Sequence, residues 1–173
     1  MGGRQFAALY KGKAGTQCFT HYLKRVGGRY VMLFVYGQQV TLRYAGVRPT
    51  RYPVRYRPAF RCADTLHNRI ATVSRRTLEL CMHEHYEDCP WREQALYAMD
   101  SRNQMLFGYY AFGEIPFAQA NLRLLSKGLR DDGLLELCAP ARVEVVIPAF
   151  SLNFILAVDE NLTYSQDRAF AES

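Results

Sequence analysis

The amino-acid pattern changes at about residue 58, and this change limits the folds that the chain can adopt. Residues 30–44 are rich in valine and aromatic side chains, which favours β-strands. Residues 46–58 contain three prolines, which exclude a helix and suit an edge strand or an extended connector. Apolar side chains then recur at helical spacing. We therefore expect an α+β chain with a β-strand region over residues 1–58 and a helical region over residues 59–173.

The helical region is expected to begin with an amphipathic helix. Asp64 is a candidate N-cap, because its carboxylate can accept hydrogen bonds from the first helical turn. The residues that follow step by three and four positions, as they do when one side of a helix is buried. These residues are Leu66, Ile70, Val73, Thr77 and Leu80.

The pattern predicts three further helices, with approximate bounds Arg92–Ala111, Pro116–Arg130 and Pro148–Tyr164. The first of these three has a stripe along one face, formed by Leu96, Met99, Asn103, Leu106 and Tyr110. The last is apolar nearly all round, which is typical of a buried inner helix. Four successive helices with short connections make two αα-hairpins.

Three carboxylates gather in the stretch Met82–Asp100. Pro90 suits the first turn of a helix, so Glu93 and Asp100 are both expected on that helix. They are separated by about two helical turns, which places their side chains on the same face. Asp88 lies in the loop that precedes the helix.

This cluster of acids has two interpretations. Acids near a helix N-terminus interact favourably with the helix dipole, and acids on a helix face are often simply solvated. Alternatively, the acids resemble those of a glycosidase. There, neighbouring negative charge and burial raise the pKa of one carboxyl group, which then donates its proton to a leaving oxygen. The spacing alone leaves both interpretations open.

The run Asp88–Glu93, with the sequence DCPWRE, resembles a family signature when Asp100 is taken with it. The family is family 78 of the glycoside hydrolases, the bacterial α-L-rhamnosidases. The resemblance includes the overlapping run His83–Pro90 and continues from about Tyr30 to Asp167. The first acid, Cys-Pro, Arg-Glu and the second aspartate all fall in register, so the match is specific.

The resemblance implies a role for each of these residues. The glutamate that matches Glu93 is the general acid of the family. The aspartates that match Asp88 and Asp100 hold sugar hydroxyls and support the acid. The arginine that matches Arg92 belongs to the same substrate-facing motif.

The sequence departs from the family pattern at three positions beside the acids. Many members have glutamine in place of Trp91, tryptophan in place of Tyr97 and glycine in place of Met99. In the family these neighbours help to form the apolar pocket for the methyl group of the sugar. Trp91 and Tyr97 are therefore further candidates for substrate binding, and the departures bear on the exact sugar more than on the reaction class.

The resemblance also implies a fold. In the family, a β-sandwich domain precedes a catalytic (α/α)6 barrel of six helical hairpins. Residues 1–58 then correspond to the last strands of the sandwich and a connector, and residues 59–173 to the first hairpins of an incomplete barrel. Missing hairpins would leave the apolar flanks of the second and fourth helices uncovered, so we expect association through these faces. A truncated frame, a fragment and a chain completed by a partner are all compatible with the sequence.

The expected reaction is hydrolysis of terminal α-L-rhamnose from glycosides, with inversion and without a cofactor. Inverting glycosidases need a second carboxylate about 6.5–9.5 Å from the acid. In the family this base lies far downstream, and no residue here matches it; Glu114, Asp159 and Glu160 are acids without an assigned role. We therefore expect little or no hydrolysis by this chain alone. The alternative is a non-catalytic carbohydrate-binding or scaffold remnant.

Other functional classes find less support. Residues 1–80 hold fifteen Lys or Arg against two Asp or Glu, but no RRM, KH or zinc-finger pattern accompanies this charge. The run His83–His85 lacks the HExxH spacing of a metal site. No apolar run is long enough to span a membrane, and the start of the chain lacks the core of a signal peptide. Because the five cysteines are scattered and form no CxxC, we expect a cytoplasmic protein with reduced thiols.

Overall fold

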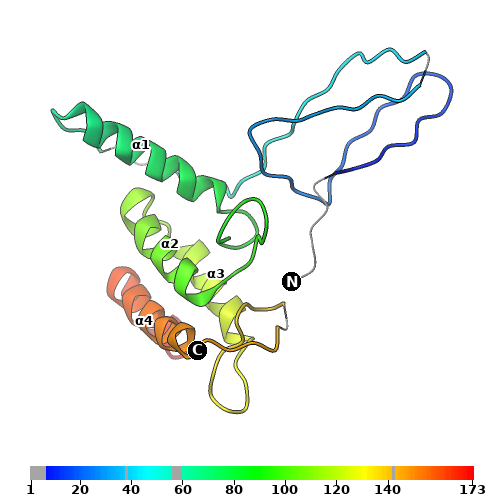
Figure 1. Ribbon diagram of the computed structural model, residues 1–173. Coiled ribbons are helices and arrows are strands. Elements are labelled where there is room, and N and C mark those ends of the chain that lie inside the picture. Colours follow the sequence, from blue (N-terminus) through cyan, green and yellow to red (C-terminus); the bar gives the residue numbers. More distant parts are fainter. Residues whose placement is uncertain (1–6, 38, 56–59, 142) are drawn as a thin grey trace.

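The computed structural model describes residues 7–37, 39–55, 60–141 and 143–173, and the regular elements in these ranges are helices. They are α1 (Thr65–Leu80), α2 (Ala98–Ala111), α3 (Ile115–Ser126), α4 (Pro148–Ser165) and α5 (Arg168–Ala171). Helix α2 packs mainly against α4, and α3 also lies on α4, while α1 contacts α2 from the side (Figure 1). None of the helices in this part of the chain is long and apolar enough to cross a membrane.

Residues 7–37 and 39–55 belong to an extended segment that leaves the helices and returns to them (Figure 1). The described part of this segment contains no strand, so the strands expected over residues 30–44 are not formed. Side chains on both faces are exposed; Tyr30 is 92% exposed and its neighbour Val31 is 70% exposed. Strand formation depends on packing against cross-strand neighbours, which composition does not reveal. The boundary expected at residue 58 lies outside the described residues.

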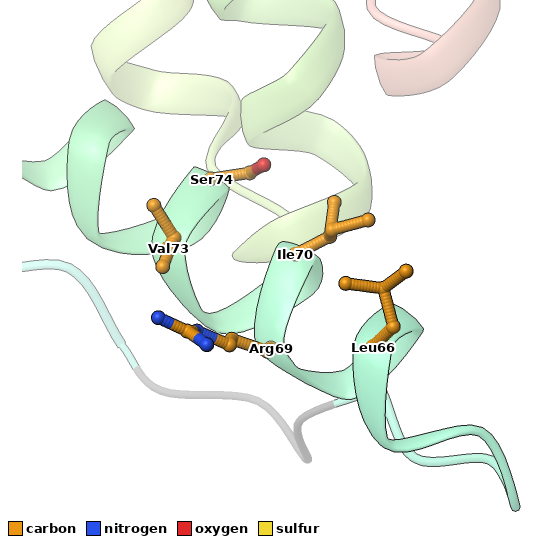
Figure 2. A pocket seen from close by; sticks show the side chains of 5 residues that line it. All are labelled: Leu66, Arg69, Ile70, Val73 and Ser74. Atoms are coloured by element: carbon orange, nitrogen blue, oxygen red, sulfur yellow. The ribbon is translucent and has the colours of Figure 1, made fainter.

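Helix α1 begins as predicted, with Asp64 as its N-cap. Asp64 Oδ1 accepts hydrogen bonds from the amides of Leu66 at 2.7 Å and His67 at 3.2 Å. The expected burial of the apolar stripe is wrong, because Ile70 is 52% exposed and Leu66 and Val73 are more exposed still. Figure 2 shows that the side chains of this face line a shallow hollow on the surface of α1. These lining residues are Leu66, Arg69, Ile70, Val73 and Ser74.

Helix α2 begins at Ala98, six residues later than expected, because a turn occupies residues 90–93. The prediction that Pro90 opens the helix is therefore wrong. Gln94 follows this turn with a positive φ of 51°, a left-handed conformation that a helix cannot include. The stripe expected along α2 is also wrong, since the residues that α2 buries are Ala98, Ser101, Met105, Gly108 and Tyr109.

Helices α3 and α4 lie close to their expected positions. Helix α3 ends at Ser126, four residues earlier than expected, and α4 ends one residue later than expected. Glu114 caps α3, because one of its carboxylate oxygens accepts from the amide of Phe117 at 3.3 Å. Helix α4 is buried on only one side, so the prediction of an inner helix covered all round is wrong. Its exposed apolar residues include Leu152, Ile155 and Leu156.

The core links the α1–α2 loop to the helices behind it. Its largest fully buried apolar side chains are Tyr86, Met82, Met105, Leu122 and Leu125. The buried amide of Asn121 anchors the loop to α3, because its oxygen accepts from the amide of Tyr86 at 2.8 Å. Its nitrogen donates to the carbonyl oxygen of Phe117 at 2.7 Å. The position of the loop is therefore set by buried hydrogen bonds as well as by apolar packing.

Candidate active site

The loop between α1 and α2 is a closed structure with its own hydrogen bonds. The amide of Glu87 donates to the carbonyl oxygen of Cys81 at 2.9 Å. The amide of Asp88 donates to the carbonyl oxygen of Ala95 at 3.1 Å, and the amide of Ala95 donates back to Asp88 Oδ1 at 2.9 Å. Residues 88–95 are therefore held as one unit, with the candidate acids at its start, within it and just beyond it.

Asp88, Glu93 and Asp100 lie close enough for their charges to interact. All three are partly buried. Burial, followed by the charges of Asp88 and Glu93, raises the pKa of the Asp100 carboxyl group. Glu93 lies in the loop and Asp100 in the first turn of α2, so the expectation that they share a helix face is wrong. The loop, and not helical periodicity, brings the three acids together.

Tyr97 is the N-cap residue of α2 and contacts the candidate acid directly. Its hydroxyl group donates a hydrogen bond to Glu93 Oε2 at 2.8 Å. Burial, and then the hydrogen bond and charge of Glu93, raise the pKa of Tyr97. Tyr97 is 8% exposed, and its ring meets the ring of Phe150 edge-on, with centroids 6.2 Å apart. A tyrosine held in this way restricts the orientation of the Glu93 carboxyl group.

The other two candidates from the motif lie on the outside of the loop. Trp91 is 51% exposed, and Arg92 is also exposed. Both belong to the turn of residues 90–93 that precedes α2. They are therefore accessible from the loop surface, while Tyr97 faces the interior.

Two of the acids that the sequence left without a role stabilise the helices. Glu114 accepts a hydrogen bond from the hydroxyl group of Tyr52 at 3.0 Å, in addition to capping α3. Glu160 pairs with Arg102, whose Nε lies 3.0 Å from Glu160 Oε2. Asp159 is exposed on α4. The structure gives no reason to assign any of these three as the catalytic base.

The histidines and cysteines of the loop do not form a metal site. The described ranges contain no group of three or more His, Cys, Asp or Glu side chains arranged to hold a metal ion. His83 instead places Nδ1 3.2 Å from Glu87 Oε2 and Nε2 3.0 Å from the carbonyl oxygen of Thr50. Burial, followed by the charge of Glu87, raises the pKa of the Cys81 thiol to about 11, so this cysteine is a poor nucleophile.

The sequence analysis missed the partner of Glu87. Glu87 is fully buried, and its carboxylate pairs with Arg25, a residue of the extended N-terminal segment. The two residues are 62 positions apart, and no local pattern connects positions so distant. The sequence shows only that an acid stands at position 87 of the motif, and this does not identify its partner.

Comparison with known proteins agrees with this description. Residues 57–170 match the family model for the bacterial alpha-L-rhamnosidase 6 hairpin glycosidase domain. The helical part is thus that of a six-hairpin glycosidase. The chain belongs to the bacterial α-L-rhamnosidase family, as the motif predicted. No curated protein is significantly similar to it.

Two solved structures resemble this chain. The first is a GH78 family rhamnosidase of Bacillus sp. GL1, with a TM-score of 0.66 and 36% identity over 69% of this chain. The second is a rhamnosidase from Klebsiella oxytoca with rhamnose bound, with a TM-score of 0.61 and 28% identity over 68% of this chain. The chain spans 13% of the length of the Bacillus protein and 24% of that of the Klebsiella protein.

Proposed function

We propose that this chain carries the proton-donating half of an α-L-rhamnosidase active site, with Glu93 as the general acid. The observation that carries the proposal is the convergence of Asp88, Glu93 and Asp100 in a chain of this family. The substrate would be a terminal α-L-rhamnose residue of a glycoside. One of the solved relatives holds rhamnose.

In the proposed complex each acid has a separate task. Asp88 Oδ1 already accepts from the amide of Ala95, so Oδ2 is the oxygen that would accept from a sugar hydroxyl. Asp100, whose pKa is raised by burial and by the other two acids, would hold a second hydroxyl group. Glu93 would transfer its proton to the glycosidic oxygen as the bond to the leaving group breaks.

Tyr97 and the exposed turn would complete the sugar contacts. The hydroxyl group of Tyr97 keeps Glu93 Oε2 in a fixed direction, so the other carboxyl oxygen would face the leaving group. Trp91 and Arg92 lie on the same loop and would contact the sugar from its open side. Arg92 would donate hydrogen bonds to hydroxyl groups, and Trp91 would supply apolar surface.

The proposed reaction inverts the anomeric carbon, and therefore needs a base that activates water opposite the acid. Glu114 and Glu160 are committed to other contacts, and Asp159 has no link to the acid cluster among the described residues. We therefore propose that the base lies outside this chain and that the chain alone hydrolyses little.

An assay with an aryl α-L-rhamnoside tests whether this chain supplies the general acid but not the base. The wild-type chain and the Glu93→Gln variant are both expected to release aryl alcohol at the background rate. Robust turnover by the wild-type chain that is lost in Glu93→Gln would contradict the proposal that the base lies outside this chain. It would support the proposal that Glu93 is the general acid. Turnover that survives in Glu93→Gln would contradict the role of Glu93.

A second candidate function is carbohydrate binding without catalysis. It is favoured by the contacts of Glu114 and Glu160, which commit both acids to other partners and leave them unsuited as the base. Binding of L-rhamnose without any turnover would support this candidate. It would use the same three acids, because they supply the oxygen acceptors in either case.

A further inference from the structure

A buried ion pair connects the N-terminal segment to the loop that carries the acids. Glu87 is completely buried, and its Oε1 accepts from Nη2 of Arg25. Arg25 is itself only 23% exposed, and the same nitrogen lies 3.1 Å from Glu84 Oε2. His83 Nδ1 lies 3.2 Å from the second oxygen of Glu87. Both oxygens of this buried carboxylate thus have partners, and one of them comes from a distant part of the chain.

The charge of Glu87 makes Arg25 difficult to replace. A carboxylate without access to water is strongly destabilised unless cationic or hydrogen-bonding partners surround it. Burial alone would lower the pKa of Arg25, but the hydrogen bond and charge of Glu87, together with the charge of Glu84, outweigh it and raise the pKa. Arg25 therefore stays charged, and the pair forms only when the N-terminal segment lies against the loop.

Three further contacts hold the same segment against the loop. Gly27 lies so close to the carbonyl oxygen of Pro90 that a side chain at this position would overlap it. On the returning part of the segment, the amide of Tyr52 donates to the carbonyl oxygen of Met82 at 2.8 Å. The carbonyl oxygen of Thr50 lies 3.0 Å from Nε2 of His83. The loop is therefore contacted by the segment at both residues 25–27 and residues 50–52.

The geometry leads us to propose that Arg25 is a positioning residue for the candidate active site. Through Glu87, it holds the loop that places Asp88 and Glu93. The proposal rests on the proposed function only in treating this loop as part of an active site. The N-terminal segment would then belong to the site, although it supplies none of the candidate acids.

The path from Arg25 to the acids is short. Glu87 directly precedes Asp88 in the chain, so a rotation at Glu87 moves Asp88 and the closed unit of residues 88–95 with it. The side-chain nitrogen of Gln104 donates to the carbonyl oxygen of Glu87 at 2.7 Å, which fixes the same residue against α2. Without Arg25, the backbone of Glu87 would keep its hydrogen bonds to Gln104 and Cys81 but would lose its connection to the N-terminal segment.

The single tryptophan of the chain makes the loop observable, because Trp91 lies within the unit that Arg25 would hold. In Arg25→Met, we expect Trp91 fluorescence to shift to longer wavelength and to be quenched more strongly by acrylamide. The α-helical circular dichroism should stay unchanged. Arg29→Met is the matched control, since Arg29 is an exposed arginine four residues away. It should behave as wild type, and Arg25→Lys should restore part of the wild-type quenching.

An Arg25→Met variant with wild-type Trp91 fluorescence and a lowered melting temperature would overturn the proposal, because the ion pair would then be structural only. If Arg25→Met does not fold, the double variant Arg25→Met/Glu87→Gln removes the unpaired buried charge and should fold. Increased Trp91 quenching in the double variant would support the proposal, and wild-type quenching would overturn it. These readouts need no sugar, so failure of the wild-type chain to bind rhamnose would count only against the proposed function.

Discussion

The hydrogen bond from Tyr97 to Glu93 is the residue-scale contact closest to the proposed chemistry. It joins the N-cap residue of α2 to the candidate acid at 2.8 Å. The resemblance implies a tryptophan at this position in many members of the family, whereas here the hydroxyl group of Tyr97 restricts the Glu93 carboxyl group. The hydroxyl group is buried with Glu93 as its partner, and removing it leaves a partly buried carboxyl group with one hydrogen bond fewer.

We expect Tyr97→Phe to lower the free energy of unfolding by about 1–2 kcal/mol, because a partly buried carboxyl group loses a hydrogen-bond donor. Urea denaturation followed by circular dichroism measures this change. Tyr44→Phe is the control, because Tyr44 is 83% exposed and its change should stay within about 0.5 kcal/mol. Equal effects of the two substitutions would show that the contact with Glu93 contributes nothing to stability.

Asp100 is predicted to destabilise the chain at neutral pH. Its pKa is raised above the usual 3.8 by burial and by the charges of Asp88 and Glu93. The ionised form is therefore penalised in the folded state above the folded pKa, and the penalty disappears as the pH falls towards 3.8. Asp100→Asn should raise the melting temperature at neutral pH, by the equivalent of about 1 kcal/mol or less. Melting curves at neutral and acidic pH measure this increase. If the melting temperature of Asp100→Asn is raised equally at acidic pH, the ionised Asp100 carboxylate is not the cause.

The helices show how far the pattern of the sequence could be followed. The N-cap of α1 and the extent of α4 were predictable, because capping side chains and helix-opening prolines act locally. The start of α2 was not, since mutual hydrogen bonds of Asp88 and Ala95 keep the preceding residues out of the helix. The motif predicted that the three acids act together, and in the structure the charges of Asp88 and Glu93 act on Asp100. Arg25 contacts Glu87 across 62 positions and could be found only from the structure.

The prediction of which side chains are buried was wrong at α1 and in the N-terminal segment for the same reason. An apolar stripe shows which face of an element is able to pack, but it does not show whether another element covers it. Ile70 of α1 and Tyr30 of the extended segment are both well exposed. The amphipathic pattern of α1 thus predicted the helix correctly, but it was wrong in predicting that the apolar face is buried.

The exposed face of α1 gives an element-scale prediction. Because Ile70 lies on this face, Ile70→Ala should change the free energy of unfolding by no more than about 0.5 kcal/mol. Leu125→Ala on α3 should cost about 2–5 kcal/mol, since Leu125 is 1% exposed in the core. Chemical denaturation of both variants, at a protein concentration low enough to keep the chain monomeric, provides the comparison. A large loss in Ile70→Ala would mean that another surface covers α1 in solution.

On the scale of the whole molecule, apolar surface is exposed on several elements at once. Its members include Ile70 of α1, Phe107 of α2 and Ile155 of α4. Exposed apolar surface of this extent favours association. We expect the apparent mass of the chain in sedimentation experiments to increase with concentration, and the double variant Ile70→Ser/Ile155→Ser to weaken this increase. A monomer at all concentrations that also fails to bind a hydrophobic dye would contradict this prediction.

The central claim is that Asp88, Glu93 and Asp100 form one sugar-binding site, and a titration of the labelled chain with L-rhamnose tests it most directly. In 1H–15N spectra we expect shifts concentrated at residues 88–100, with saturation. They should be strongly reduced in Asp88→Asn and retained in Asp159→Asn, where the exchanged acid is exposed on α4. Absence of shifts in the wild-type chain, or shifts that Asp88→Asn leaves unchanged, would contradict the claim.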